Sequence, residues 1–305
     1  MDADLLTQFE TARAARAAAV ERLLERLLDP RPRDGEIERP RRLMDAMRHG
    51  VLNGGKRLRP FLVIESAALF DVPETTALRV AAALECIHCY SLIHDDLPAM
   101  DDDDLRRGKP TVHRAFDEAT AILAGDALLT FAFDIVAGED TALAPPIRLD
   151  LVSRLARAAG AGGMVGGQML DLAAETSAPD EAGILTLQAM KTGALIRFAC
   201  EAGPVMADAG SADRERLSEF GAAIGLAFQI ADDLLDLTAS AEAMGKATGK
   251  DAGAGKATLV GLHGEAWARH QLSGLVEQAG DLLSPFGEKA EMLRAAARFI
   301  AAREH

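Results

Sequence analysis

The sequence predicts an all-α protein, built as a single bundle of about ten helices. Ala and Leu supply most of its 49% hydrophobic residues, while aromatic residues make up only 4%, a balance that favours helix over strand. Apolar residues recur at helical spacing almost everywhere, and no segment shows convincing alternation with a period of two. No repeat or low-complexity linker divides the 305 residues. We therefore expect one domain over residues 1–305, with sites formed between facing helices.

Helical periodicity and the positions of Pro and Gly set the boundaries of the expected helices. Proline pairs and glycine-rich turns interrupt the pattern, because proline lacks a backbone donor and glycine favours turns. The expected helices cover residues 4–28, 38–50, 58–70, 74–97, 118–137, 147–172, 180–202, 212–238, 258–283 and 288–303.

Charge and composition restrict the partners of the protein. The formal net charge of -14 disfavours a nucleic acid partner, since phosphate backbones attract basic surfaces, whereas a small phosphorylated substrate needs only a few local cations. The acidic N-terminus is unlike a signal peptide, and no run approaches the roughly 18 apolar residues of a membrane span. Three cysteines give no disulfide framework, and the Cys86–Cys89 pair lacks a second pair for zinc. We predict a cytoplasmic protein.

Two of the most apolar segments, 84–97 and 220–237, end in clusters of aspartates. Helices that are apolar on most faces are usually central to a bundle, so these clusters should lie at the rim of the core. In the second cluster, Asp232 and Asp236 are one helical turn apart and share a face. In the first, Pro98 ends the helix after Asp95 and Asp96, so Asp101 must return from the following loop.

Clustered carboxylates at the C-terminal end of a helix are doubly unfavourable, because they repel one another and meet the negative end of the helix dipole. A bound cation would compensate both effects. Mg²⁺ fits best, since it takes a few carboxylates and completes its shell with water and substrate phosphates. The alternative is a solvated acidic face, which becomes less attractive when two clusters occur in similar apolar settings.

Basic residues gather at four places in this acidic chain: 55–60, 106–110, 191–193 and 246–256. Arginine offers a planar fork to phosphate oxygens and lysine a compact charge. Arg106 and Arg107 follow closely after Asp101, an arrangement typical of a metal–diphosphate site flanked by direct phosphate donors. The alternative is a network of surface salt bridges with little effect on stability.

Six stretches, in this order, resemble the trans-polyprenyl diphosphate synthase family, and within it most closely the bacterial farnesyl diphosphate synthases. They are GGKRLRP at 54–60, IHCYSLIHDDLPAMDDDDLRRGKPTVH at 87–113, ILAGDAL at 122–128, GGQMLDL at 166–172, KTGALI at 191–196 and GLAFQIADDLLD at 225–236. The resemblance implies an isoprenoid-synthase helical bundle around a central cavity, a homodimer, and Mg²⁺-dependent joining of an allylic diphosphate to isopentenyl diphosphate.

The resemblance also implies roles for individual residues. Three Mg²⁺ ions are expected per active site, held by Asp95, Asp96, Asp101, Asp232 and Asp236. The residues implied to bind the allylic diphosphate are Arg106, Lys191, Thr192, Gln229 and Lys246. Those implied to bind isopentenyl diphosphate are Lys56, Arg59, His88 and Arg107. For His88 the alternative is a core histidine with satisfied hydrogen bonds.

Tyr90 is expected to limit product length. It lies five residues before Asp95, roughly 7–8 Å along a helix, and an aromatic residue here tends to stop growth near the C15 product in the family the chain resembles. The expected product is therefore (E,E)-farnesyl diphosphate. The alternatives are a geranyl or geranylgeranyl product, a terpene cyclase, or a non-catalytic partner subunit. The last two are disfavoured by the presence of both acidic clusters and of Lys56 and Arg59.

Overall fold

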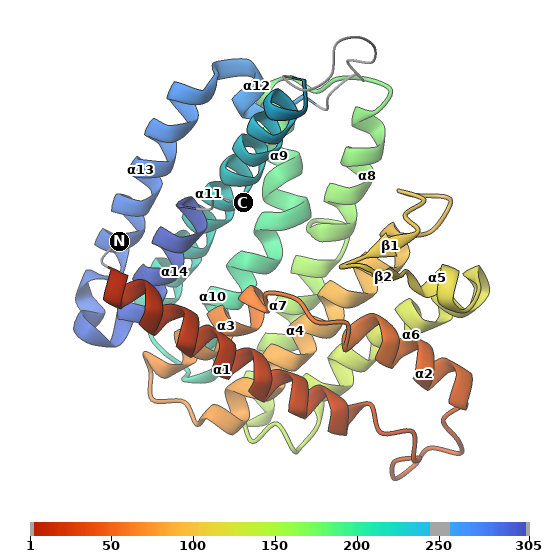
Figure 1. Ribbon diagram of the computed structural model, residues 1–305. Coiled ribbons are helices and arrows are strands. Elements are labelled where there is room, and N and C mark those ends of the chain that lie inside the picture. The colour runs from red at the N-terminus through yellow and green to blue at the C-terminus, as the bar shows by residue number, and fades with distance from the viewer. Residues whose placement is uncertain (1–2, 245–256, 303–305) are drawn as a thin grey trace.

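Helix α4 (Glu74–Asp95) lies among other helices along most of its length, as its apolar sequence predicts. The computed structural model describes residues 3–244 and 257–302. In it, α4 packs between α3 (Leu58–Ala68) and α6 (Glu118–Ala137), and its first turns bury a run of alanines, Ala81 to Ala83 (Figure 1). Small side chains let neighbouring helices approach closely, so the C-terminal end of α4 is held firmly at the rim of the core.

The second central helix is α11 (Ser211–Met244), which packs against α10 (Ala194–Met206) and α13 (Glu265–Leu282). Helix α10 in turn crosses α3 very closely. A Cβ atom on Gly203 would lie 2.3 Å from the backbone of Ser66, so only glycine fits at the crossing. Ser66 completes the contact by donating a hydrogen bond to the carbonyl of Ala199 at 3.1 Å.

The remaining helices surround these central ones and share one core, whose buried apolar residues run from Phe9 to Ile300. They are α1 (Ala3–Leu27), α2 (Arg41–Val51), α5 (Val112–Ala115), α7 (Pro145–Ala159), α8 (Met164–Ala174), α9 (Glu181–Gln188), the π-helical turn η1 (Ala189–Gly193), α12 (Leu259–His263), the 3₁₀ segment η2 (Ser284–Ala290) and α14 (Glu291–Ala301). The prediction of an all-α fold is confirmed.

One short hairpin interrupts the helical pattern, and the sequence prediction missed it. Strand β1 (Leu105–Arg106) pairs antiparallel with β2 (Lys109–Pro110). Its turn residues Arg107 and Gly108 both have positive φ angles, 53° and 76°, as a two-residue hairpin turn requires. The hairpin is too short to have a detectable alternating pattern. It holds the two arginines close to the end of α4.

Three of the expected helices are divided in the structure. The segment expected as one helix over 258–283 breaks at Gly264, whose φ angle is 84°, into α12 and α13. The segment expected as one helix over 147–172 breaks at Gly160–Gly163 into α7 and α8. The backbone leaves helical geometry there: Gly160 has φ -85° and ψ -154°, and Gly163 has φ -136° and ψ -133°. The segment expected over 180–202 contains the π-helical turn η1 between α9 and α10. A π turn adds a residue to the local helix and is common at functional sites.

Two of the described helices, α4 and α6, are long and apolar enough to cross a membrane by length and composition alone. In α4, 72% of the most apolar 18-residue stretch is buried inside the bundle, as in the core helix of a globular protein. In α6 only 39% of the corresponding stretch is buried, so one apolar side of α6 faces outward.

Candidate active site

The loop between α2 and α3, residues 52–57, has an unusual backbone. Gly54 and Gly55 have φ angles of 75° and 127°, and Arg57 also has a positive φ of 47°. At Gly55 a Cβ atom would lie 2.5 Å from the guanidinium of Arg107, so the loop can approach that arginine only because the residue is glycine. Arg107 also donates a hydrogen bond to the carbonyl of Gly54. The loop and the hairpin are thereby joined.

Arg57 anchors this loop in the core. Its side chain is fully buried and forms an ion pair with Glu85 of α4, whose side chain is only 2% exposed. The guanidinium also donates to the carbonyl of Val51 at 2.6 Å and contacts Glu21 of α1 at 3.3 Å. A buried arginine with this many partners fixes the backbone on either side of it, so the side chains of Lys56 and Arg59 project from a rigid base.

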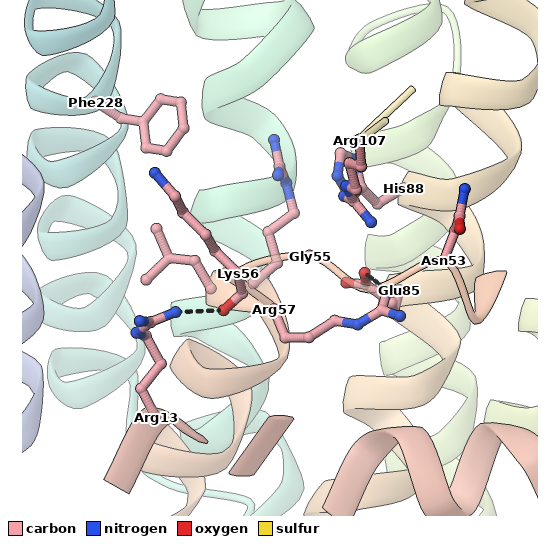
Figure 2. A pocket seen from close by; sticks show the side chains of 11 residues that line it. Arg13, Asn53, Gly55, Lys56, Arg57, Glu85, His88, Arg107 and Phe228 are labelled. Carbon is pink, nitrogen blue, oxygen red and sulfur yellow. Dashed lines mark hydrogen bonds and ion pairs between the residues drawn. The ribbon is translucent and has the colours of Figure 1, made fainter. Parts of the chain in front are cut away.

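A cavity of about 530 Å³ opens above this loop (Figure 2). We call it the cationic cavity. The four side chains predicted to bind isopentenyl diphosphate all line it: Lys56, Arg59, His88 and Arg107. They come from three separate segments, the loop with the start of α3, the middle of α4 and the hairpin turn. The structure therefore brings together residues that lie up to 51 positions apart in the sequence.

The environment of His88 reflects the positive charge of this cavity. Burial lowers the pKa of His88 well below its usual value, and the charges of Arg59 and Arg107 lower it further. The imidazole is therefore neutral at physiological pH, and one ring nitrogen can donate while the other accepts. Within the cationic cavity, His88 is suited to hydrogen bonding with a ligand, and the fixed positive charge comes from the arginines and Lys56.

The first acidic cluster has the shape that its sequence predicts. Asp95 is the last residue of α4, and the chain turns back through Pro98 so that the backbone N–H of Asp101 donates to the carbonyl of Asp95 at 2.8 Å. The Asp95 and Asp101 side chains are close enough to interact electrostatically. Burial raises the pKa of Asp95 to about 6, opposed by Lys191 and reinforced by the charge of Asp101. Its carboxylate thus lacks full compensation.

Asp96 and Arg106 already have partners in the structure. Asp96 is 3% exposed and accepts from the Nε of Arg106 at 2.6 Å, while a second nitrogen of Arg106 contacts Asp103 at 3.2 Å. Burial raises the pKa of Asp96, and the hydrogen bond from Arg106 opposes this rise. Asp96, predicted to bind a metal, and Arg106, predicted to bind a diphosphate, are therefore joined by an ion pair.

A second cavity of about 570 Å³ lies between α4, α6, α8 and η1, and we call it the apolar cavity. Its walls are mostly hydrophobic: Tyr90, Leu92, Leu97, Met100, Ile122, Met164, Val165, Met169 and Leu172. Asp95, Lys191 and Thr192 also line it. Arg59 and His88 line both this cavity and the cationic one, so the two spaces adjoin.

Lys191 reaches the apolar cavity from the π-helical turn η1. Its Nζ forms an ion pair with Asp171 of α8 at 2.7 Å, and its charge also acts on Asp95. Glycine is required opposite it, because a Cβ on Gly167 would lie 2.2 Å from the backbone nitrogen of Lys191. The sequence prediction gave no role to Asp171, although it lies within the 166–172 motif, because an ion pair across helices leaves no local pattern.

Gln168 was also missed. It lines the apolar cavity, and both polar atoms of its side-chain amide are buried without a hydrogen-bond partner among the described residues. A buried amide without partners is costly unless a ligand or water satisfies it. Its position in the 166–172 motif was the only signal available in the sequence.

The second acidic cluster belongs to α11. Phe228 of this helix lines the cationic cavity, and Asp232 lies one turn further along. Asp232 and Gln229 are half-buried, whereas Asp236 is exposed. Asp233, to which no role was assigned, accepts a hydrogen bond from Gln188 at 3.1 Å, and burial raises its pKa to about 6. Lys246 lies outside the described residues.

Comparisons with known proteins find polyprenyl diphosphate synthases. The sequence profile of the family described as "Polyprenyl synthetase" matches residues 40–281. The farnesyl diphosphate synthase of Geobacillus stearothermophilus is 41% identical over 288 residues, which cover 94% of this chain and 95% of that protein. Geranylgeranyl pyrophosphate synthase 9 of Arabidopsis thaliana is 43% identical, covering 88% of this chain and 76% of its own.

Among solved structures, an FPP/GFPP synthase from Zymomonas mobilis, in an apo crystal structure, superposes with a TM-score of 0.87. It is 48% identical in sequence, and the match covers 97% of this chain and 100% of the other. The similarity in fold therefore extends over nearly the whole chain.

Proposed function

Because this chain belongs to the polyprenyl synthetase family, we propose that it is a trans-prenyltransferase that joins isopentenyl diphosphate to dimethylallyl or geranyl diphosphate. The product is (E,E)-farnesyl diphosphate, and diphosphate is released. The comparisons confirm the predicted family, the isoprenoid-synthase bundle and the prenyltransferase class. We further propose that residues 1–305 form one domain and that the enzyme acts in the cytoplasm.

The observation that best supports this function is the contact between two cavities of opposite character. The cationic cavity suits a diphosphate, and the apolar cavity suits a hydrocarbon tail. Since Arg59 and His88 line both, a ligand in one space lies beside a ligand in the other. Each substrate has a diphosphate and an apolar part. Adjoining cavities hold the allylic carbon of one substrate close to the double bond of the other, as the reaction requires.

The binding roles follow from this placement. Lys56, Arg59, His88 and Arg107 hold the diphosphate of isopentenyl diphosphate in the cationic cavity. The allylic diphosphate is held by Arg106, Lys191, Thr192, Gln229 and Lys246, with its tail in the apolar cavity. Support for the second set comes from Lys191 and Thr192, which line the apolar cavity beside Asp95.

The donor chemistry of the site fits a hard divalent cation. Asp95 and Asp101 interact at the negative end of the α4 dipole, and the raised pKa of Asp95 reflects a carboxylate with too little positive charge around it. In the described parts of the chain, no three His, Cys, Asp or Glu side chains form a ready metal site. A complete set of protein ligands is not required for Mg²⁺, which commonly binds one or two carboxylates and completes its shell with substrate phosphates.

We propose three Mg²⁺ ions at the site, the number that the family resemblance implies. Asp95, Asp96 and Asp101 would hold them from the end of α4, and Asp232 with Asp236 from α11. Bound Mg²⁺ supplies Lewis-acid stabilisation of the negative charge that develops on the leaving diphosphate. The pairing of Asp96 with Arg106 supports a close association of this metal site with a direct phosphate donor.

The protein's own side chains orient the reactants and protect them. As the allylic C–O bond breaks, its electron pair leaves on the diphosphate, where Lys191 and Arg106 provide fixed positive charge. The double bond of isopentenyl diphosphate supplies the electrons for the new C–C bond. Loss of a proton from the adjacent carbon, to the released diphosphate, restores the double bond. The apolar walls exclude water, which would otherwise capture the allylic cation.

The decisive experiment is to incubate the purified protein with isopentenyl diphosphate, Mg²⁺ and each allylic primer, and to measure product chain length. We expect C15 as the main product, and loss of activity when Mg²⁺ is chelated. A terpene cyclase would consume an allylic diphosphate without isopentenyl diphosphate. A non-catalytic partner subunit would give no product with any primer. Either result would contradict the proposal.

Product length should depend on Tyr90. Its side chain lines the apolar cavity, and its ring lies 5.8 Å from that of His94 in an edge-on arrangement. Tyr90→Ala removes bulk from this wall, so we expect products of C20 and longer to increase relative to C15. The measurement is chromatography of the dephosphorylated products. Tyr90→Phe, which keeps the ring, is the control. An unchanged C15 profile in Tyr90→Ala would assign the limit to another residue.

We propose a homodimer that covers the outward apolar side of α6 and α8. Leu123 is 58% exposed on α6, and Leu170 is 39% exposed on α8. Leu123→Glu places a charge on this side, and we expect the dimer to dissociate because a buried unpaired charge is costly. Light scattering coupled to size-exclusion chromatography measures the mass. Leu262→Glu, at an exposed leucine of α12, is the control and should remain dimeric. A monomeric wild-type protein would contradict this interface.

A further inference from the structure

Arg13 reaches the cationic cavity from α1, a helix to which the sequence prediction gave no functional role. One guanidinium nitrogen donates to the backbone carbonyl of Lys56 at 3.2 Å, as Figure 2 shows. The guanidinium also lies over the ring of Phe299 of α14, 5.5 Å from its centroid. Helices near the two ends of the chain thus hold Arg13 in place at the cavity wall.

Among the described residues, no carboxylate is paired with Arg13. Five cationic side chains line the cationic cavity, and Glu85 is the only carboxylate among the lining residues. Glu85 is already paired with Arg57. Arg16, three residues further along α1, forms ion pairs with Glu65 and Glu74. In the described parts of the chain Arg13 forms no such pair, and its Nε is buried without a hydrogen-bond partner.

Two features of this position are unfavourable without an anion: other cationic side chains line the same cavity, and the buried Nε of Arg13 has no acceptor among the described residues. A bound polyanion reverses both effects. Apart from the donor that binds the carbonyl of Lys56, the N–H groups of Arg13 can donate to phosphate oxygens. The stacking on Phe299 restricts the side chain, so little conformational entropy is lost when a ligand binds.

We propose that Arg13 is a further binding residue for the diphosphate of isopentenyl diphosphate, contributed by the N-terminal helix. It lies outside residues 40–281, the part of the chain matched by the family profile. The inference rests on the proposed function, since it assigns the same substrate to the cationic cavity. To Lys56, Arg59, His88 and Arg107 it adds a contact from α1.

The test is the affinity for isopentenyl diphosphate alone, without an allylic partner, measured by titration calorimetry on full-length protein. One charge-assisted hydrogen bond corresponds to roughly a tenfold change in affinity. We therefore expect Arg13→Gln to weaken binding about tenfold. Arg13→Lys, which keeps the charge, should weaken it less. Arg22→Gln is the matched control, because Arg22 is exposed on the same helix and lines neither cavity. Its affinity should equal that of the wild type.

Isopentenyl monophosphate separates direct contact from a merely structural role. A residue that contacts the second phosphate should matter less for the monophosphate, so the loss caused by Arg13→Gln should shrink with that ligand. The KM for geranyl diphosphate should stay unchanged. Unchanged affinity for isopentenyl diphosphate, or an equal loss with both ligands, would overturn the assignment of Arg13. An inactive wild-type protein would instead overturn the proposed function, so the two failures are distinguishable.

Discussion

Replacement of Asp95 by alanine is expected to reduce turnover by on the order of 10²–10³-fold or more, the range seen when one group that stabilises transition-state charge is removed. Asp95 lies where α4 ends, beside Asp101, Lys191 and the apolar cavity. Without it, the proposed Mg²⁺ site would lose one of its ligands, and the leaving diphosphate would be less well stabilised. Turnover should be measured at saturating substrate and over a range of Mg²⁺ concentrations.

The fold should tolerate this change. A folded-state pKa raised to about 6 means that the ionised Asp95 destabilises the ligand-free protein at higher pH, so removal of its charge costs no stability at pH 7. Thermal unfolding of the ligand-free variant should therefore match or exceed that of the wild type. Asp104→Ala is the control, because Asp104 belongs to the same acidic run but pairs with Arg114 on the surface. Near-normal turnover in Asp95→Ala would rule out the proposed mechanism.

Asp232→Ala, on α11, should cause a comparable loss of turnover. Asp232 lies one turn beyond Phe228, which lines the cationic cavity. If Asp95 and Asp232 hold metal ions around one diphosphate, each substitution should raise the Mg²⁺ concentration required for half-maximal turnover. A loss confined to Asp95→Ala would remove α11 from the metal site.

The second large effect is expected for stability, at the buried pair of Arg57 and Glu85. Arg57→Met should lower the free energy of unfolding by about 3–5 kcal/mol, because Glu85 would remain in the core without its counter-ion. Denaturant-induced unfolding, followed by circular dichroism, provides the measurement. Such a loss is large relative to the 5–15 kcal/mol by which typical domains are stable.

The double variant Arg57→Met with Glu85→Met is the matched comparison. Replacing both members of a buried pair with apolar residues of similar volume is often neutral, so most of the lost stability should return. The isopentenyl diphosphate site should nevertheless be impaired, because Arg57 also fixes the loop through the carbonyl of Val51. A loss in Arg57→Met of below about 1 kcal/mol, as for an exposed pair, would contradict the anchoring role of Arg57.

Much of the fold was predictable because helical periodicity is a local property. The segments over 74–97 and 118–137 were expected as helices and correspond closely to α4 and α6. The break at Gly160–Gly163 was missed although its glycines were visible in the sequence, since apolar spacing continues across it. The π turn at Lys191 could not be predicted, because it depends on how α8 and α11 pack around that residue.

The sequence alone determined the residues on which the proposed chemistry depends: two aspartate clusters after apolar helices, Pro98 turning the chain back to Asp101, and groups of cations in an acidic chain. Only the tertiary structure decided which of these cations is buried in an ion pair and which lines a cavity. In GGKRLRP the letters do not distinguish Arg57, paired in the core, from Lys56 and Arg59, which line a cavity. Nor do they place Arg13 beside them. Burial and pairing arise from contacts between distant segments, and no local pattern encodes such contacts.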